Sequence, residues 1–176
     1  MRMNNKRKEF SYVVSYLGQT MYHEHVTYFD KNKTIEIVAK RKNETEIERI
    51  ILEKKTRRVI DYIKLQNNIQ VMSLILEQNN TYRYNKSSDL FIKSNRPFLL
   101  PIMFQCMECF EQSDKGMITE NVLVPSNEMT FFPYSYYWFP TKVNIIRPES
   151  IFMEYSNDGQ LLYMKEFQTQ CIKKRI

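Results

Sequence analysis

A Cys-x-x-Cys pair, Cys106 and Cys109, is a short motif with known redox and metal chemistry. Two thiols at this spacing can form a redox couple or supply half of a zinc site. The other half of a zinc site could come from His23 and His25, because residues two apart in a strand point to the same side. Cysteine is also a small apolar residue that is commonly buried, and both thiols fall on an apolar stripe. We therefore expect core packing and assign no metal ligand and no cofactor.

A second pattern is the acidic alternation Glu44, Glu46 and Glu48, which would place three carboxylates on one face of a strand. Basic residues lie close to it in the sequence, namely Lys40, Lys42, Arg49, Lys54 and Arg57. This mixture is similar to the charged interior of triphosphate-tunnel barrels, which hold metal and polyphosphate. Such barrels need more charged alternation in their later strands, whereas residues 117–167 are aromatic and apolar. We expect a solvated outer face, and a metal-dependent phosphohydrolase remains an alternative.

The run of aromatic residues between Phe131 and Pro140 is the most unusual feature of the sequence. Aromatic residues on both faces of a strand exceed what a sheet with one buried face needs. In an extended strand, Phe132, Tyr134, Tyr136 and Trp138 share one side. This side would line an apolar cavity or a partner surface, since ligand pockets are mostly aromatic and apolar. The predicted ligand-binding residues are Trp138, Tyr136, Tyr134, Phe132, Met103, Met107 and Phe110.

No catalytic constellation accompanies these residues. Neither histidine has a Ser or Cys nucleophile beside it in a recognisable motif, so a catalytic triad has no support. Only 3 glycines occur, which argues against glycine-rich phosphate loops. We predict that the protein is not an enzyme.

The elements that would position the aromatic strand are mostly β-strands. Alternating apolar and polar residues, with turn signals every ten to twelve residues or so, predict an antiparallel meander in the first half of the chain. Asn67-Asn68 and Asp158-Gly159 are typical of hairpin turns. Between the two meanders, Leu99, Ile102, Met103, Cys106, Met107 and Phe110 recur at spacings of three and four, which predicts a central helix over about residues 98–112. The predicted fold is mainly β: one domain over 1–176, with a strongly curved antiparallel sheet, a half-barrel or a barrel, wrapped on this helix.

The net charge and the composition of the chain restrict the classes of partner that we expect. The net charge is +6, with basic clusters at Lys6–Lys8, Lys40–Lys42, Lys54–Arg58 and Lys173–Arg175, which permits a polyanion partner without requiring one. Three cysteines do not suggest a disulfide framework, and a reduced compartment is the simplest inference. We see no secretory signal and no apolar stretch of about 20 residues that would span a membrane. Nucleic acid is an unlikely partner, because the basic clusters lie mostly away from the aromatic run.

The predicted order of meander, helix and hairpins resembles the LolA-like half-barrels, which include periplasmic lipoprotein carriers. The likeness is closest at Tyr137-Trp138-Phe139-Pro140-Thr141-Lys142-Val143, Met153-Glu154-Tyr155 and Asp158-Gly159-Gln160-Leu161-Leu162-Tyr163. The resemblance implies a curved sheet that binds acyl chains or another apolar ligand without catalysis. It also implies an envelope location if an export signal was removed; otherwise we expect a cytoplasmic protein.

The leading hypothesis is a non-enzymatic binding domain with an aromatic-lined cavity or groove for a lipid or another hydrophobic molecule. The alternative is an interaction protein that uses a basic face to bind an acidic protein or nucleic acid. The third hypothesis is the phosphohydrolase named above.

Overall fold

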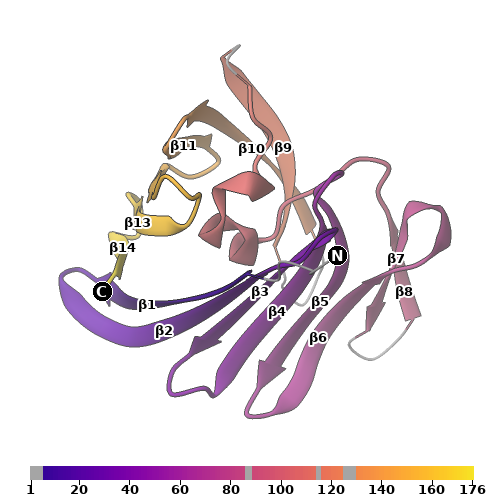
Figure 1. Ribbon diagram of the computed structural model, residues 1–176, viewed down its shortest axis with the longest axis horizontal. Coiled ribbons are helices and arrows are strands. Elements are labelled where there is room, and N and C mark those ends of the chain that lie inside the picture. Colours follow the sequence, from indigo (N-terminus) through magenta and orange to yellow (C-terminus); the bar gives the residue numbers. More distant parts are fainter. Residues whose placement is uncertain (1–5, 86–88, 114–115, 125–129) are drawn as a thin grey trace. The chain divides into compact units, whose positions relative to one another are not determined.

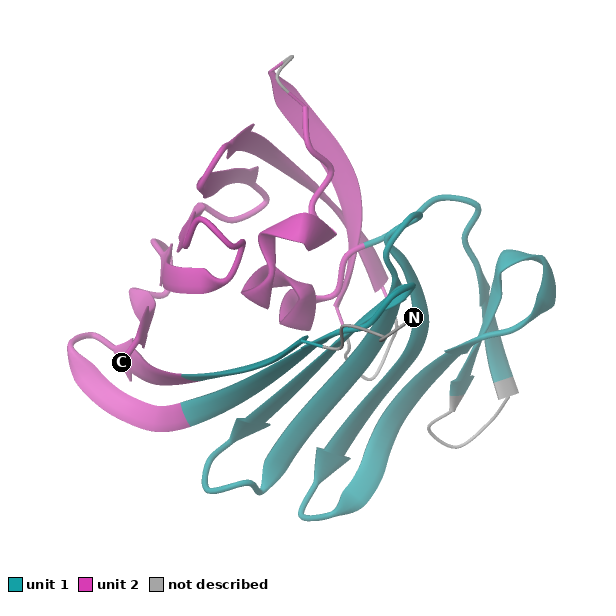
Figure 2. Ribbon diagram, viewed as in Figure 1, with its two compact units in different colours: residues 1–10, 24–98 teal, residues 11–23, 99–176 magenta. Residues whose placement is uncertain are grey.

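The computed structural model describes residues 6–85, 89–113, 116–124 and 130–176. Two compact units make up the chain (Figure 2): unit 1 holds residues 1–10 and 24–98, and unit 2 holds residues 11–23 and 99–176. We predicted a single domain over 1–176. Both units are built from separate stretches of sequence, because two long strands near the N-terminus run through both.

Those two strands are β1 (Lys6–Tyr16) and β2 (Gln19–Asp30). The other strands of unit 1 are β3 (Thr34–Arg41), β4 (Glu46–Glu53), β5 (Arg58–Gln66), β6 (Ile69–Leu76), β7 (Thr81–Asn85) and β8 (Asp89–Lys93), with a short 3₁₀ turn η1 (Gln78–Asn80). The other strands of unit 2 are β9 (Met117–Val124), β10 (Thr130–Phe139), β11 (Lys142–Arg147), β12 (Ile151–Tyr155), β13 (Leu161–Glu166) and β14 (Cys171–Arg175). Unit 2 also holds two 3₁₀ turns, η2 (Pro101–Gln105) and η3 (Met107–Cys109).

All of these strands belong to one antiparallel sheet (Figure 1). The strand order is β8-β7-β6-β5-β4-β3-β2-β1-β14-β13-β12-β11-β10-β9, with the residues of β1 and β2 divided between the two units. The antiparallel, strand-rich prediction is therefore confirmed. The sheet is not closed into a barrel, since its order begins at β8 and ends at β9.

The predicted hairpin turns are confirmed. Asn67 and Asn68 join β5 to β6 with φ of 51° and 63°, the left-handed backbone that mirror-image turns require and that Asn tolerates. Gly159, with φ of 79°, lies in the turn between β12 and β13. These short connections make neighbours in the sequence neighbours in the sheet.

The predicted central helix over 98–112 is wrong. The segment forms η2 and η3 instead, and Cys106 between them is extended, with φ of −134° and ψ of 122°. Cys106 forms a β-bridge with Gln160, and the amide of Met107 donates to the carbonyl of Gly159 at 2.9 Å. Strand-like pairing therefore interrupts the helical hydrogen bonds at this point.

The apolar residues that recur at spacings of three and four in this segment have a physical explanation other than a helix. From Leu99 to Phe110 every residue is buried except Pro101 and Glu108, so the apolar residues do not form a stripe on one helix face. A segment that is apolar all round must be enclosed, whatever its backbone conformation. We call residues 99–110 the core segment of unit 2; Figure 1 shows its coils η2 and η3 among the strands of that unit.

Unit 1 has its own row of buried side chains across the sheet. The pairs link Tyr28 to Ile37, Ile37 to Ile50, Ile50 to Tyr62, Tyr62 to Leu74 and Leu74 to Tyr84. Of these, Ile37, Ile50, Tyr62 and Leu74 have no exposed surface. Adjacent residues such as Ile51 point to the opposite face, which is only half-buried.

This register predicts unequal effects for two neighbouring isoleucines of β4. Ile50→Ala should lower the free energy of unfolding by about 2–5 kcal/mol, because it leaves a cavity in the buried row. Ile51→Ala, the same truncation on the half-buried face, should cost less than about 1 kcal/mol. Denaturant unfolding of both variants measures the difference, and equal losses would contradict the register of β4.

Candidate functional site

The aromatic strand β10 turns one set of side chains toward the interior of unit 2. Its register with β9 is regular, so Phe132, Tyr134 and Tyr136 lie opposite Val122, Glu120 and Ile118 on one face. Trp138 continues this face opposite Val143 of β11. The predicted alternation along β10 is thereby confirmed.

The structure brings most of the predicted ligand-binding residues together, but not all of them. Tyr134, Tyr136, Met103, Met107 and Phe110 are buried in unit 2. Trp138 is half-buried. Phe132, near the start of β10, is 42% exposed and stands outside the buried group.

Phe110 lies at the centre of a buried aromatic cluster. Its ring centroid is 5.5 Å from that of Phe104, 5.3 Å from that of Tyr136 and 6.5 Å from that of Tyr155. Tyr134 joins through Phe104 at 6.4 Å. The geometries are stacked, tilted and edge-on, which are the favourable arrangements of aromatic pairs. Two members come from the core segment and three from the sheet.

Few polar groups interrupt this cluster, and each has a defined place. The hydroxyl of Tyr155 donates to the carbonyl of Phe104 at 3.0 Å, and burial raises the pKa of Tyr155 well above its ordinary value. The hydroxyl of Tyr136 donates to Oε2 of Glu120 at 2.5 Å and accepts from the amide of Glu111 at 3.0 Å. These bonds attach the middle of the core segment, at Phe104, and the residue that follows it, Glu111, to the sheet.

Trp138 contributes the one unsatisfied polar atom on this face of β10. Its indole Nε1 is buried and has no hydrogen-bond acceptor among the residues that the structure describes. A buried N–H without a partner is costly, and such groups call for a physical explanation.

The cysteines of the Cys-x-x-Cys pair are buried, whereas both histidines are exposed. Cys106 and Cys109 are buried thiols of the core segment. His23 and His25 are exposed and point to the opposite face of β2 from buried Glu24 and Val26. Across the described parts of the chain, no group of three or more His, Cys, Asp or Glu side chains could hold a metal ion.

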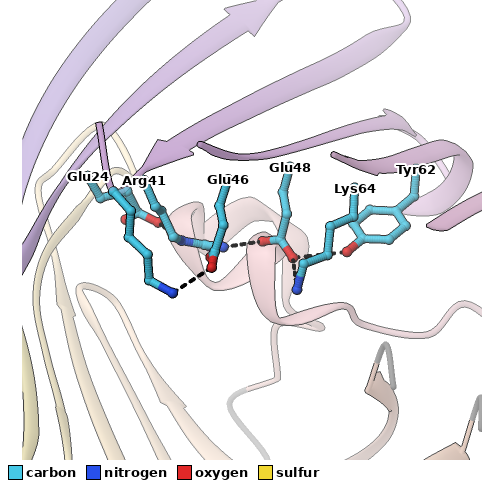
Figure 3. Close-up of polar contacts among 7 residues, drawn as sticks. Glu24, Arg41, Glu46, Glu48, Tyr62 and Lys64 are labelled. Atoms are coloured by element: carbon cyan, nitrogen blue, oxygen red, sulfur yellow. Dashed lines mark hydrogen bonds and ion pairs between the residues drawn. The ribbon is translucent and has the colours of Figure 1, made fainter. Parts of the chain in front are cut away.

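Unit 1 carries a polar network on the face that also holds its buried row (Figure 3). The register places Glu24 opposite Arg41, Arg41 opposite Glu46, and Glu48 opposite Lys64. Arg41 donates to Oε1 of Glu24 at 2.5 Å and to Oε2 of Glu48 at 2.7 Å. Glu24 is 1% exposed and Glu48 is 7% exposed, so Arg41 joins two buried carboxylates.

The other oxygen of Glu48 completes the network. It accepts a hydrogen bond from the hydroxyl of Tyr62 at 2.9 Å and lies 3.8 Å from the ammonium of Lys64. Burial, then the charge of Glu48, raises the pKa of Tyr62 far above its ordinary value. Each carboxylate therefore faces a hydrogen-bond donor or a cation.

This network corrects our interpretation of the acidic alternation. Glu44 lies in the turn before β4 with φ of 68°, is exposed, and pairs with Lys40. Glu46 pairs with Lys42, whose hydrogen bond lowers the pKa of the Glu46 carboxyl. A solvated outer face was predicted, but Glu48 is buried because it shares a face with Ile50 and Leu52. The carboxylates bind the protein's own cations rather than presenting an open metal site.

Sequence reasoning missed Glu24, Arg41, Tyr62 and Lys64 as members of this network. A signal existed for Glu24, which alternates with the buried Val26 and Tyr28. The register that brings Arg41 and Lys64 to the same place depends on strand pairing, which the sequence pattern alone does not specify.

A third polar cluster, also missed, lies in unit 2 beside Tyr134. Glu149 lies close enough to Tyr134 and Glu166 to influence, and be influenced by, their charges. Burial raises the pKa of the Glu149 carboxyl, and the neighbouring Glu166 raises it further. Burial first, then the two carboxylates, raise the pKa of Tyr134 to about 12. The cluster therefore favours the neutral form of the Glu149 carboxyl.

The basic clusters do not form one free surface. Arg41 and Lys42 are paired as described, and Lys54 pairs with Asp30. In β14, Lys174 is exposed whereas Lys173 is buried. Within the described ranges, no helix is long and apolar enough to cross a membrane.

Comparison with known proteins finds a structure with a similar fold. No protein-family profile and no curated protein sequence matches the chain. The chain is similar to a crystal structure of a β-barrel-like protein of the domain of unknown function DUF1849 from Brucella abortus, with a TM-score of 0.52 and 8% sequence identity. The match covers 99% of this chain and 95% of that chain. The comparison therefore supports the fold alone, a large antiparallel sheet.

The network of unit 1 leads to a stability prediction. Arg41→Met should lower the free energy of unfolding by about 3–5 kcal/mol, because it leaves two buried carboxylates without their shared cation. Arg49→Met is the matched control: Arg49 pairs with Glu36 and Asp61 on the other face, its side chain is 37% exposed, and its loss should cost less than about 1 kcal/mol. Adding Glu24→Gln and Glu48→Gln to Arg41→Met should recover much of the lost stability. Equal effects of Arg41→Met and Arg49→Met in denaturant unfolding would contradict this role.

The glutamate pair of unit 2 leads to a pH prediction. The folded-state pKa of Glu149 is raised, so its ionised form opposes folding above that pKa and the cost disappears as the pH falls through it. Glu149→Gln should therefore raise the free energy of unfolding at pH 7, with no gain at a pH well below the ordinary carboxyl pKa. Glu166→Gln should act in the same direction, and the double variant should add little, because one neutral partner relieves the pair. Destabilisation by both single variants at pH 7 would show that the carboxylates do not repel each other.

Proposed function

We propose that this protein is a non-enzymatic binding domain that takes up a hydrophobic molecule, such as a lipid, on the inner face of unit 2. The ligand would contact the buried aromatic cluster from the sheet side, through Tyr134, Tyr136 and Trp138. It would occupy space that the core segment fills in the absence of a ligand.

The observation that carries this proposal is the character of the core segment. It is buried on nearly all sides and does not form an α-helix. The bonds within it are those of 3₁₀ turns, such as the bond from the amide of Met103 to the carbonyl of Leu100 at 2.8 Å, and the amides of Leu99 and Met107 donate instead to the carbonyls of Asn121 and Gly159. A short 3₁₀ turn is a weak element compared with an α-helix. To admit a ligand, the segment would exchange its side-chain packing and its two β-bridges to the sheet, Leu99 with Val122 and Cys106 with Gln160.

The side chains of the segment also suit exchange with a ligand. Met103 and Met107 are buried, unbranched and polarizable, and methionine adapts to irregular contents better than branched residues do. A linear apolar ligand could therefore replace part of their contact with the aromatic rings at little cost in packing.

We extend this proposal to a LolA-like type of carrier. The large antiparallel sheet supports this extension, although the helix of that resemblance does not form in residues 98–112. The resemblance implies acyl chains as the ligand. An envelope location follows only within this proposal.

The first experiment is native mass spectrometry of the purified protein, followed by denaturing extraction of any bound molecule. We expect a co-purifying apolar molecule that is released on denaturation. A bare protein mass, together with no uptake of an added hydrophobic dye, would reject the carrier function and favour the interaction-protein alternative.

The site itself is tested with Nile red and two adjacent tyrosines of β10. Tyr136 is fully buried in the cluster, whereas Tyr137 is 39% exposed on the other face. Tyr136→Leu should weaken Nile red binding about tenfold, the scale of one lost aromatic contact, and Tyr137→Leu should leave it unchanged. Emission of Trp138, the single tryptophan, should be quenched by energy transfer to the bound dye. Equal affinities of both variants, each shown to be folded, would exclude the inner face as the site.

A further inference from the structure

Strand β8 is the last strand at one edge of the sheet of unit 1 (Figure 1). Within the described residues it pairs with β7 alone, so no strand lies beside its outer edge. The sheet order ends differently at β9, where Leu99 forms a β-bridge with Val122 and its amide and carbonyl both bond to that strand, at 2.9 and 2.8 Å. An uncovered edge strand is a template on which another strand can pair.

One hydrogen bond at the end of β8 shows which of its backbone groups point outward. The amide of Ser94 donates to the carbonyl of Asn80 at 3.0 Å, on the side of β7. Backbone groups alternate in direction along an antiparallel strand, so the amides and carbonyls of Lys93 and Phe91 point away from β7. An incoming antiparallel strand would therefore exchange hydrogen bonds with Phe91, at the middle of β8.

The middle residues of β8 are apolar and largely exposed on both faces of the sheet. Leu90 is 55% exposed and Phe91 is 57% exposed, and adjacent residues of a strand point to opposite faces. Leu90 continues the buried row of unit 1, because it lies opposite Tyr84, which is 2% exposed. The row thus ends on an exposed apolar side chain where the sheet ends. Native sheets protect open edges with a charge or a proline inside the strand, and the middle of β8 has neither.

The sequence of β8, Asp-Leu-Phe-Ile-Lys, complements itself in the antiparallel direction. Two copies paired about Phe91 would bring Asp89 opposite Lys93 of the second copy, and Leu90 opposite Ile92 of the second copy. Residues of opposite charge would then stand at both ends of an apolar centre. A shift of one residue would oppose backbone groups that already bond to β7, and a shift of two would separate the charges. The pairing about Phe91 alone satisfies both conditions.

We propose that β8 is a dimerisation edge, on which a second copy of this chain pairs antiparallel about Phe91. The same residues of both copies form the contact, as a two-fold interface requires. The pairing adds about six backbone hydrogen bonds and joins the unit 1 sheets of two copies into one. A strand of five residues offers little area, so we expect a dissociation constant on the order of tens of micromolar. The inference does not rest on the proposed function, because β8 belongs to unit 1 and the proposed ligand site to unit 2.

The first measurement is sedimentation equilibrium of the full chain from about 1 to 200 µM, a range that brackets the expected dissociation constant. The average mass should rise with concentration from that of one chain toward that of two. The mass of a single chain at every concentration would overturn the inference.

Two variants on one face of the sheet form a matched pair. Phe91→Lys would place like charges opposite each other on the two-fold axis and should weaken dimerisation at least about tenfold. Ile75→Lys makes the same change in net charge on the same face, because Ile75 and Phe91 both lie opposite Arg83, from its two sides. Ile75 is 37% exposed and lies on β6, away from the edge, so this variant should dimerise like the wild type. Circular dichroism checks folding, and equal dimerisation of both folded variants would overturn the role of β8.

The charged ends of β8 test the register itself. Asp89→Lys and Lys93→Asp each oppose like charges across the pairing, so each variant alone should dimerise more weakly than the wild type. An equimolar mixture of the two should associate about as well as the wild type, because every charge of one variant then faces its opposite in the other. No gain of association on mixing the folded variants would overturn the pairing about Phe91, and so would undiminished dimerisation of either variant alone.

Discussion

A strand can point its side chains to only two faces, and this alternation decides which polar groups of the protein become buried. Glu48 enters the interior because it lies two residues from Ile50, and Lys173 does so because it lies opposite Val14. Neither residue would be buried on the basis of its own chemistry. The sheet must then compensate for each buried charge at the place where the register puts it.

Unit 1 achieves this compensation with side chains of neighbouring strands. Cations and carboxylates alternate from β2 to β5, so that Arg41 contacts two buried carboxylates and Glu48 has donors on both oxygens. Such a network contributes less to net stability than apolar packing of the same volume, but removing one member is costly. It also fixes the register, because a shift of one residue would move every charge to the other face.

The sequence was sufficient to predict the strands and several turns, but not the core segment. Period two along β3 and β4 is strong because one face is buried, and Asn67-Asn68 specifies its turn locally. The pattern from Leu99 to Phe110 was misleading, because complete burial and a helical stripe both produce apolar residues at spacings of three and four. The decisive contact, Cys106 with Gln160, joins residues distant in sequence. The same holds for the candidate site: β10 could be assigned its inner face, whereas Glu149, Glu166 and the inward position of Lys173 follow from pairing that no local pattern encodes.

The character of the core segment bears on the ligand specificity of the proposed site. Under the proposed function, a hydrophobic ligand that enters unit 2 would exchange its contacts for those of Met103, Phe104 or Phe110, and one apolar contact would replace another. Such an exchange changes the free energy little and does not distinguish one apolar molecule from another of similar shape. Discrimination must then come from polar groups that are satisfied only by the correct partner. On the inner face of β10, the indole N–H of Trp138 is such a group, because it has no acceptor among the described residues, so a polar group of the ligand, rather than its apolar length, would determine what the proposed site selects.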